Sequence, residues 1–446
     1  MSVLQGYIRP TVEPPHHRKS PSPPLHDPER LLNCRHFMIA IYGGSRMRTN
    51  ALLLGFAFPG YALYHIFRPH LLPNTGIGLF TITLLIAAAA AVSNWSYRGI
   101  AGKPILNTAA LPIAGVHWAL MIWMMCVILI NTGAGNVPPV DAVASLQFVV
   151  AMVGMFCLGV GFTTPRGSGL FVIWSAFFLG LCIYYYVPSL GYVEIPPGPL
   201  EEQHTAYALT ANYQGIARSI MYTGLLFIPF IKSRLVKSAV FFFYCGLLVM
   251  SGSRTDAALM VLLVPVFAYI NYGPMKTVLL GAAVIAGLTL LALVYGLDSG
   301  GRYSMGGASA SLGERSLFLS SGLENILANP VRGDFMYYLR EFGSSGAYIH
   351  NGLSMWADYG LFAMALYVVL IFSALAVGIV EVFPGRRRGI PECLLYLSIT
   401  SLIGVAISRS ISWPMPALAW GIAYGILSRK VQTGRQDAVA QLAISS

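Results

Sequence analysis

Residues 353–380 read LSMWADYGLFAMALYVVLIFSALAVGIV, and this stretch decides the fold. Asp358 is its only charged residue. An α-helix needs about 20 mostly apolar residues to cross the hydrocarbon layer of a membrane, so the stretch predicts a membrane-spanning helix. The whole chain has the same character, with 56% hydrophobic and only 10% charged residues and a mean hydropathy of +0.66. A water-soluble domain could not bury so much apolar surface, and the composition therefore excludes that class.

Working outward from this stretch, further apolar runs predict about twelve membrane-spanning helices. The fold class that we expect is an all-α polytopic membrane protein, with its membrane domain over residues 47–430. The expected spans are 51–67, 76–93, 111–131, 142–163, 169–187, 216–231, 236–252, 255–271, 277–297, 353–380, 392–408 and 412–428.

Lys and Arg are concentrated in alternate connections between these spans. Because Lys and Arg in short loops stay in the cytoplasm, the pattern predicts two cytoplasmic termini, with residues 431–446 as a cytoplasmic tail. In this arrangement 20 of the 28 basic residues lie inside, Lys237 among them. The net charge of +11 then reflects basic loops beside anionic lipid and indicates no nucleic acid partner. The eight basic residues left outside are all arginines: Arg68, Arg218, Arg254, Arg302, Arg315, Arg332, Arg340 and Arg409.

The first 46 residues form a polar, Pro-rich arm that we expect to be disordered. The arm lacks the apolar core and cleavage site of a secretory signal peptide. Met47, followed by a basic residue and an apolar run, is a natural start for such a protein, which leaves open whether residues 1–46 belong to it. The chain has six cysteines and no C-x-x-C pair, so neither a disulfide framework nor a zinc site is indicated.

Two expected outer connections are long enough to form a site, namely residues 188–215 and residues 298–352, the latter between the ninth and tenth spans. Arginine grips phosphate oxygens in pairs through its planar fork, so an outer face that is basic through arginine alone indicates phosphate binding. The alternative for each arginine is that it snorkels to the membrane surface or pairs with a nearby carboxylate. The second connection carries Arg302, Arg315, Arg332, Arg340 and His350.

Arg254 lies in the short turn Ser251-Gly252-Ser253-Arg254-Thr255-Asp256 between two expected spans. Serine before an apolar helix acts as an N-cap, and a helix N-terminus is a ready anion site. The alternative is a plain helical hairpin in which Asp256 neutralises Arg254.

His350 ends the long connection, directly before the stretch that decides the fold. A histidine at the membrane surface can take a proton from a hydroxyl near neutral pH, which a general base must do. The alternative is a surface or capping histidine, and Asn351 is expected to be the N-cap of the following helix.

Five short motif pieces stand out in the second half of the sequence: Ser251-Gly252-Ser253-Arg254-Thr255, Leu312-Gly313-Glu314-Arg315-Ser316, Asn329-Pro330-Val331-Arg332-Gly333, His350-Asn351-Gly352-Leu353 and Asp358-Tyr359-Gly360-Leu361. Taken together, these pieces resemble the O-antigen ligase and O-antigen polymerase family. The resemblance covers about residues 205–380, and it rests on the order of the pieces and on their shared outer side. In that family the glycine after the Pro motif is often followed closely by another glycine, whereas Asp334 follows Gly333 here.

The resemblance implies glycosyl transfer at the periplasmic face of a bacterial inner membrane, in the biosynthesis of lipopolysaccharide or exopolysaccharide. The donor would be a glycan on undecaprenyl pyrophosphate, and the acceptor the lipid A core or another lipid-linked glycan. The arginine of the family's Ser-Arg turn falls on Arg254, its long-loop arginine on Arg315 and its histidine on His350. Further phosphate or sugar contacts would come from Arg218, Arg302 and Arg340.

In the mechanism implied, Arg254 and Arg315 stabilise the charge of the departing pyrophosphate. His350 takes the proton of the acceptor hydroxyl, which attacks from the opposite face and inverts the anomeric carbon. We expect no cofactor and no metal, because the first outer connection contains no carboxylate; Glu201-Glu202 is the one adjacent acidic pair on the outside that could hold an ion.

Three other functions stay open at this point. A protein O-oligosaccharyltransferase would use the same donor chemistry. A transporter, or a flippase of lipid-linked oligosaccharide, would be expected to show related halves and polar groups near the membrane midplane, and neither is evident. A haem electron carrier would need facing histidines within spans, whereas His117 has no evident partner in the sequence.

Overall fold

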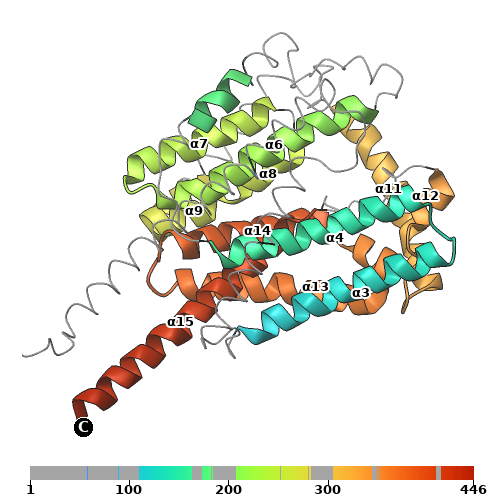
Figure 1. The fold of residues 1–446 in the computed structure, drawn as a ribbon. Coiled ribbons are helices and arrows are strands. Elements are labelled where there is room, and N and C mark those ends of the chain that lie inside the picture. Colours follow the sequence, from blue (N-terminus) through green and yellow to red (C-terminus); the bar gives the residue numbers. More distant parts are fainter. Residues whose placement is uncertain are drawn as a thin grey trace, which may run out of the picture. The chain divides into compact units, whose positions relative to one another are not determined.

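The computed structural model describes residues 58, 89, 110–162, 173–181, 183, 207–251, 253–279, 281–282, 305–343, 349, 351–407 and 413–445. The chain divides into two units, Met1–Arg46 and Met47–Ser446, and all described residues belong to the second. Within these ranges the secondary structure is helical, with no strand (Figure 1). The helices that bear on the argument are α3 (Leu111–Gly133), α4 (Pro139–Val160), α6 (Tyr207–Phe227), η1 (Ile228–Phe230), α7 (Arg234–Met250), α8 (Arg254–Leu262), α9 (Val264–Tyr272), α11 (Met305–Ala328), α12 (Tyr337–Phe342), α13 (Leu353–Val382), α14 (Ile390–Ile407) and α15 (Met415–Ser445).

Several of these helices have the length and composition of membrane spans. By these criteria five segments qualify among the described residues, and Gly215–Phe230 is a shorter apolar helix. The chain is therefore a helical protein that spans a membrane, while the total of about twelve spans stays a prediction. The expected spans 51–67, 76–93, 169–187 and 277–297 lie wholly or partly outside the described residues. The five segments are Leu111–Gly133, Asp141–Val160, Arg254–Tyr272, Leu353–Val382 and Ile390–Ile407.

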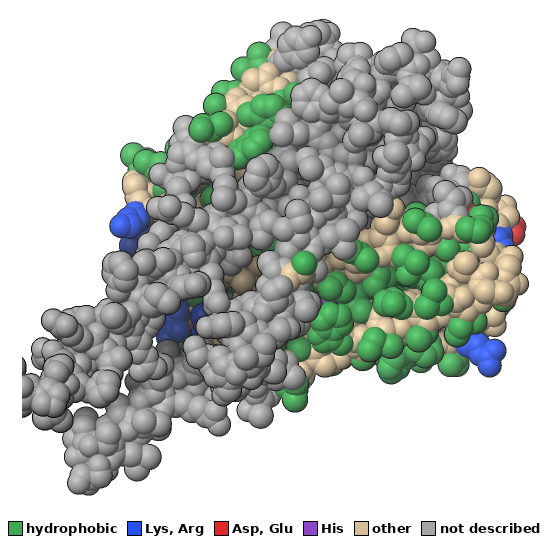
Figure 2. All heavy atoms as spheres, viewed as in Figure 1, with side chains coloured by type: hydrophobic (Ala, Val, Ile, Leu, Met, Phe, Trp, Pro, Cys, Tyr) green, Lys and Arg blue, Asp and Glu red, His purple; other side chains and the backbone are tan. Residues whose placement is uncertain are grey.

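The exposed surface of the described helices carries many large apolar side chains. On α3 the side chain of Ile130 is 68% exposed, and on α13 that of Val380 is 64% exposed. Figure 2 shows apolar side chains over much of the coloured surface, with Lys and Arg at its margins. A soluble protein rarely exposes so large an apolar area, and lipid is the environment that suits it.

Small residues bring the membrane helices into backbone contact. A Cβ atom on Gly421 of α15 would overlap the carbonyl oxygen of Phe156 on α4, and one on Gly159 would lie 2.8 Å from the Cα atom of Gly421. Close approach at glycine is the usual way in which helices associate in lipid, where burial of apolar surface gives no driving force. This contact fixes α15 along α4.

Charged residues at the ends of the membrane helices lie together at one end of the helices, which we call the basic end. Glu381, near the end of α13, accepts from Arg387 Nη1 at 3.2 Å and also pairs with Lys430 of α15. The hydroxyl of Tyr272, the last residue of α9, donates to the backbone carbonyl of Arg234, the first residue of α7, over 3.1 Å.

We call the opposite end of these helices the motif end. The direction of each helix shows which of its residues lie there. Since Tyr272 lies at the basic end, Arg254 at the start of the span Arg254–Tyr272 lies at the other. The backbone N–H of Gly352, before α13, donates to the carbonyl of Val405, near the end of α14, over 2.7 Å. A Cβ atom on Gly404 would lie 3.4 Å from Leu259 of α8.

A buried ion pair sits just inside the basic end, where the sequence predicted only a basic loop. Lys237 in the first turn of α7 reaches Glu392 in the first turn of α14 with Nζ and Oε2 2.6 Å apart, and both side chains are 0% exposed. Lys237 Nζ also donates to the carbonyl of Pro229 at 3.3 Å. The second carboxylate oxygen of Glu392 accepts from the Tyr396 hydroxyl at 2.7 Å and from Asn271 Nδ2 at 3.4 Å. Lys237 therefore joins α7 to η1 and to α14. The sequence did not show this contact, because Glu392 lies on a helix far away along the chain.

Three segments expected to be loops or tail are helical instead. The expected outer connection 298–352 contains α11 and α12, and α6 begins at Tyr207 inside the expected connection 188–215. Helix α15 continues to Ser445 through the expected tail. Segments such as α11, which is rich in Ser and Gly, contain no apolar run long enough to predict a membrane span. A helix outside the hydrocarbon layer needs only one apolar face, so these segments can still be helical.

Candidate functional site

Helix α13 is broken near its start, at Gly360, where φ is 81° and ψ is 177°. The break leaves backbone carbonyls without a helical partner, and other elements supply donors for them. The carbonyl of Tyr359 accepts from the indole Nε1 of Trp123 on α3 over 2.8 Å. The carbonyl of Ala357 accepts from the backbone N–H of Asp334 over 2.7 Å. The apolar stretch that reads as one continuous span is therefore a short helix followed by the span proper.

The turn formed by residues 329–336 occupies this break. Its Pro330 carbonyl accepts from the N–H of Leu361 at 3.2 Å and from Trp356 Nε1 at 2.7 Å. Gly333 has a φ of 68°, and a Cβ atom there would lie 2.5 Å from the backbone nitrogen of Gly360. Two motif pieces that are far apart in the sequence, 329–333 and 358–361, thus form one structure, which we call the helix-break unit.

The helix-break unit predicts that Gly360→Ala is strongly destabilising locally. A Cβ atom at Gly360 would overlap the carbonyl oxygen of Val331, and the backbone conformation is one that only glycine adopts without strain. We expect a cost of about 2–3 kcal/mol and faster cleavage of the 329–336 turn in limited proteolysis. Gly115→Ala on α3, where a Cβ atom meets nothing within 4 Å, is the matched control. Unchanged proteolysis of Gly360→Ala would contradict the tight contact.

Asp334, which follows Gly333 where the family often has a second glycine, has a structural role here. Its carboxylate pairs with Arg340, whose Nη1 donates to the carbonyl of Phe335 over 2.7 Å. The neighbouring Asp358 accepts from the N–H of Met336 at 3.3 Å. Arg340, which the resemblance offered as a phosphate or sugar contact, is thus engaged in holding the turn.

Arg332 belongs to the motif piece Asn329-Pro330-Val331-Arg332-Gly333, and the sequence counted it among the outer arginines without giving it a role. It is exposed on the turn that occupies the helix break, and it makes no ion pair with any residue in the described ranges. The backbone of this turn is held by contacts of Gly333 with Gly360 and of Pro330 with Leu361, which the sequence did not show.

Helix α11 packs onto the start of α13 through a small buried cluster of Ile326, Tyr338, Ile349 and Ala357. The hydroxyl of Tyr338 donates to the carbonyl of Phe318 over 2.8 Å. Burial, and then the nearby Asp358 charge, raises the pKa of Tyr338, so the hydroxyl stays protonated and keeps this bond. The segment that contains α11 and α12 is therefore anchored on the helix-break unit.

Arg315 lies half-buried on α11, seven residues before Gly322. Gly322 faces Tyr338 and Ile349, and two helical turns separate it from Arg315, so both lie on one face, roughly 10 Å apart. This places Arg315 on the side of α11 that meets Ile349. His350 and Arg302 lie outside the described residues.

Arg254 is the first residue of α8 and is half-buried at the motif end. The neighbouring Ser253 is the N-cap residue, but its hydroxyl donates to Asp256 Oδ2 at 2.6 Å instead of accepting from the backbone. Arg254 forms no ion pair with Asp256 or with another residue of the described ranges. The guanidinium and the first N–H groups of α8 therefore present positive charge at the same place.

Arg218 lies half-buried on α6, one turn before Tyr222. The ring of Tyr222 contacts that of Trp413, with centroids 5.9 Å apart, and a Cβ atom on Gly404 would lie 2.9 Å from the Trp413 ring. Because Gly404 is near the motif end of α14, Arg218 lies toward that end as well.

The N-cap residue of α13 is Gly352, one residue after the predicted Asn351. The Oδ1 atom of Asn351 accepts from the N–H of Leu353 at 2.9 Å in the turn that leads into the helix. Among the described residues no three His, Cys, Asp or Glu side chains are grouped as metal ligands would be. Glu201 and Glu202 lie outside those residues.

His117, the one histidine in the described ranges, is fully buried against Phe156, with ring centroids 4.1 Å apart. Neither ring nitrogen has a hydrogen-bond partner there. Its neighbours also include the rings of Trp118 and Trp420. An aromatic environment of this kind is that of a packed core residue.

A scan against family models and a search of curated proteins found no match for this chain. The function of the site has therefore to be argued from its own residues and their geometry.

Proposed function

We propose that this chain is a glycosyltransferase that moves a glycan from undecaprenyl pyrophosphate to a sugar hydroxyl. The acceptor class is the lipid A core or a second lipid-linked glycan, as in an O-antigen ligase or an O-antigen polymerase. One observation carries the proposal. The pieces that suggested this chemistry, around Arg254, 329–333, 351–353 and 358–361, gather at the motif end, although more than 100 residues separate the first piece from the last along the chain.

The orientation belongs to the same proposal. Since the basic end carries the Lys and Arg of the short connections, it faces the cytoplasm of a bacterial inner membrane and the motif end faces the periplasm. We expect Leu327→Cys, at a side chain that is 79% exposed on α11, to react with an impermeant maleimide on intact spheroplasts. Arg387→Cys at the basic end should react only after lysis. Both variants need the native cysteines replaced by alanine, including Cys126, which is exposed. The reverse labelling pattern would overturn the orientation.

The electrostatics of the motif end suit a pyrophosphate leaving group. Negative charge grows on the pyrophosphate as the anomeric bond breaks, and cations fixed in advance stabilise this charge most when it is largest. Arg254 and Arg315 take this role, with Arg332 as an added contact from the helix-break unit. Arginine suits it because its fork binds two phosphate oxygens at once.

The remaining step is the activation of the acceptor. The acceptor hydroxyl oxygen forms a bond to the anomeric carbon while the bond from that carbon to the pyrophosphate oxygen breaks. The hydroxyl proton passes to His350, and undecaprenyl pyrophosphate departs with the electron pair. Attack from the face opposite to the leaving group gives inversion.

The proposal is tested with purified protein, a lipid-linked donor and a glycan acceptor. We expect Arg254→Ala to reduce transfer by about 10²–10³-fold, since one lost charge contact to a transition state typically costs that much. Arg234→Ala, which removes an exposed arginine at the basic end, is the matched control and should leave transfer within about twofold. Absence of transfer by the wild-type protein, with peptide glycosylation in its place, would instead indicate a protein O-oligosaccharyltransferase.

The same assay with excess chelator tests the role of arginine. We expect transfer to continue, because guanidinium groups supply the positive charge that a divalent metal would bring to the pyrophosphate. Loss of activity that added magnesium or manganese restores would refute this mechanism and direct attention to Glu201 and Glu202.

A further inference from the structure

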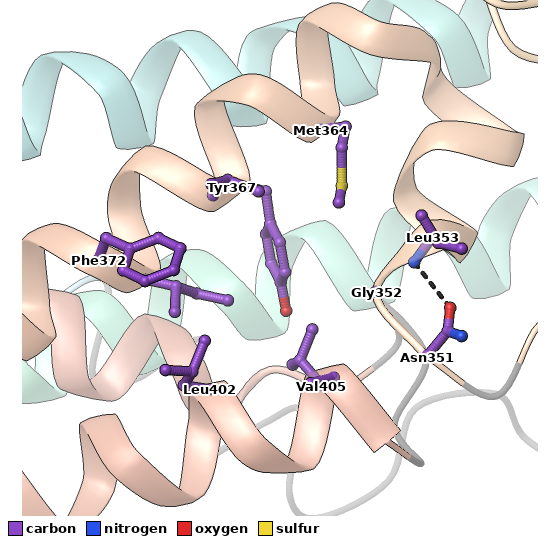
Figure 3. Close-up of a pocket in the computed structure, with 11 residues that line it drawn as sticks. Asn351, Gly352, Leu353, Met364, Tyr367, Phe372, Leu402 and Val405 are labelled. Carbon is purple, nitrogen blue, oxygen red and sulfur yellow. Dashed lines mark hydrogen bonds between the residues drawn. The ribbon is translucent and has the colours of Figure 1, made fainter.

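A cavity of about 280 Å³ lies between α13 and α14 at the motif end, next to Asn351 and Gly352 (Figure 3). This volume is at the lower limit of small-molecule sites, which suits a segment of a chain better than a compact ligand. Two residues of its wall, Phe372 at 54% exposure on α13 and Ala406 on α14, are exposed, so the cavity is open on one side. The other side chains of the wall are mainly apolar, among them Leu353, Met364, Val368, Leu402 and Val405.

One polar side-chain group inside the cavity has no partner. Tyr367 is fully buried, and its hydroxyl makes no hydrogen bond with any residue in the described part of the chain. Figure 3 shows the hydroxyl directed across the cavity toward Val405. The ring is fixed from behind by Trp420, with ring centroids 5.5 Å apart, so the hydroxyl is held in this direction. A buried hydroxyl without a partner is costly, and the cavity is where a partner can enter.

The chemistry of the wall limits what that partner can be. A bound water needs two to four polar partners. Besides the Tyr367 hydroxyl, the wall has one polar side chain, Asn351, and its Oδ1 atom already accepts from the N–H of Leu353. A sugar or an ion would leave more polar groups unsatisfied for the same reason. A bare hydrocarbon would fill the cavity but leave the hydroxyl unpaired. The occupant that fits is an apolar chain that carries one hydrogen-bond acceptor.

The depth of the cavity within the membrane also fits an apolar chain that carries one hydrogen-bond acceptor. Val405 lies two residues before the end of α14 and is bonded to Gly352, where α13 begins. Helical side chains point toward the N-terminus of their helix, which for Tyr367 on α13 is the motif end. The hydroxyl is therefore near the boundary between hydrocarbon and headgroups, where the ester carbonyls of glycerolipids lie.

We propose that the cavity between α13 and α14 is a specific site for one acyl chain of a membrane glycerophospholipid, with the hydroxyl of Tyr367 donating to its ester carbonyl. The acyl chain leaves past Phe372 and Ala406 into the surrounding lipid. The cavity borders the motif piece at Asn351 and Gly352. Its test reads binding without turnover, so the result does not depend on the proposed transfer.

The test uses the purified full-length chain and a phosphatidylethanolamine with a photoreactive diazirine in one acyl chain. We expect saturable crosslinks in α13 and α14. Unlabelled diester phosphatidylethanolamine should compete about fivefold better than its diether analogue, which lacks the carbonyl, because a single neutral hydrogen bond changes affinity by about that factor. Tyr367→Phe should remove the difference and keep the crosslinks. Tyr272→Phe, at the basic end, should keep both, and Ala406→Trp, at the open side, should abolish the crosslinks.

Three results would overturn the proposal. Equal competition by the diester and the diether on the wild-type protein would show that no carbonyl is bound. Stronger competition by undecaprenyl phosphate than by the diester would assign the cavity to a polyprenyl chain. Crosslinks that never reach α13 or α14, or that do not saturate, would show that no specific site exists there.

Discussion

Glu392→Ala is expected to lower the free energy of unfolding by about 3–5 kcal/mol, the usual cost of removing one partner from a buried ion pair. The substitution removes Glu392 Oε2, which lies 2.6 Å from Lys237 Nζ. Among the described residues the fully buried ammonium of Lys237 then keeps the Pro229 carbonyl as its hydrogen-bond acceptor. The substitution also removes the acceptor of the Tyr396 hydroxyl. The measurement is denaturant titration of the purified protein in mixed micelles.

Two further variants separate the ion pair from a general effect of mutation. Glu324→Ala, at an exposed position on α11, should change the free energy of unfolding by no more than about 0.5 kcal/mol. Lys237→Met combined with Glu392→Leu should recover at least about 2 kcal/mol relative to Glu392→Ala, since apolar pairs often replace buried ion pairs at little cost. A double variant as unstable as the single one would show that the charge of Lys237 is not the cause.

His350→Ala is expected to reduce glycan transfer by about 10²–10⁴-fold, the range over which a positioned general base contributes. Amounts of protein in the membrane should stay unchanged, because the bond from the Leu353 N–H to Asn351 Oδ1 at the start of the following helix does not involve the substituted side chain. The measurement is the transfer assay with purified protein. Activity of His350→Ala near that of the wild type would remove His350 as the base.

Substitutions of Arg315 test the same transfer reaction at a second residue. Arg315→Ala should abolish transfer, and Arg315→Lys should recover little of it, because lysine lacks the fork that binds two phosphate oxygens. Full recovery with lysine would indicate that a point charge at this position is sufficient. The transfer would then need no paired contact from α11.

The sequence alone determined the membrane character and the extent of the main described helices. Hydropathy is a local property, since any helix in lipid must be apolar over about 20 residues whatever its neighbours are. The expected spans 111–131, 353–380 and 392–408 therefore agree closely with α3, α13 and α14. The start of α13 was predictable to within one residue for the same reason, because the bond from the Leu353 N–H to Asn351 Oδ1 joins residues two apart in the chain.

The tertiary structure decided where the chemistry of the candidate site gathers. Gly360 breaks a stretch that is apolar throughout, and the break exists because the turn of residues 329–336, from another part of the chain, occupies it. The same applies to the partner of Lys237, which comes from Glu392 on a distant helix. Hydropathy and motif spacing describe neighbours along the chain, whereas these contacts depend on which helices pack together. For that reason the sequence predicted which residues bear charge, and only the packing of the helices decided which of them meet.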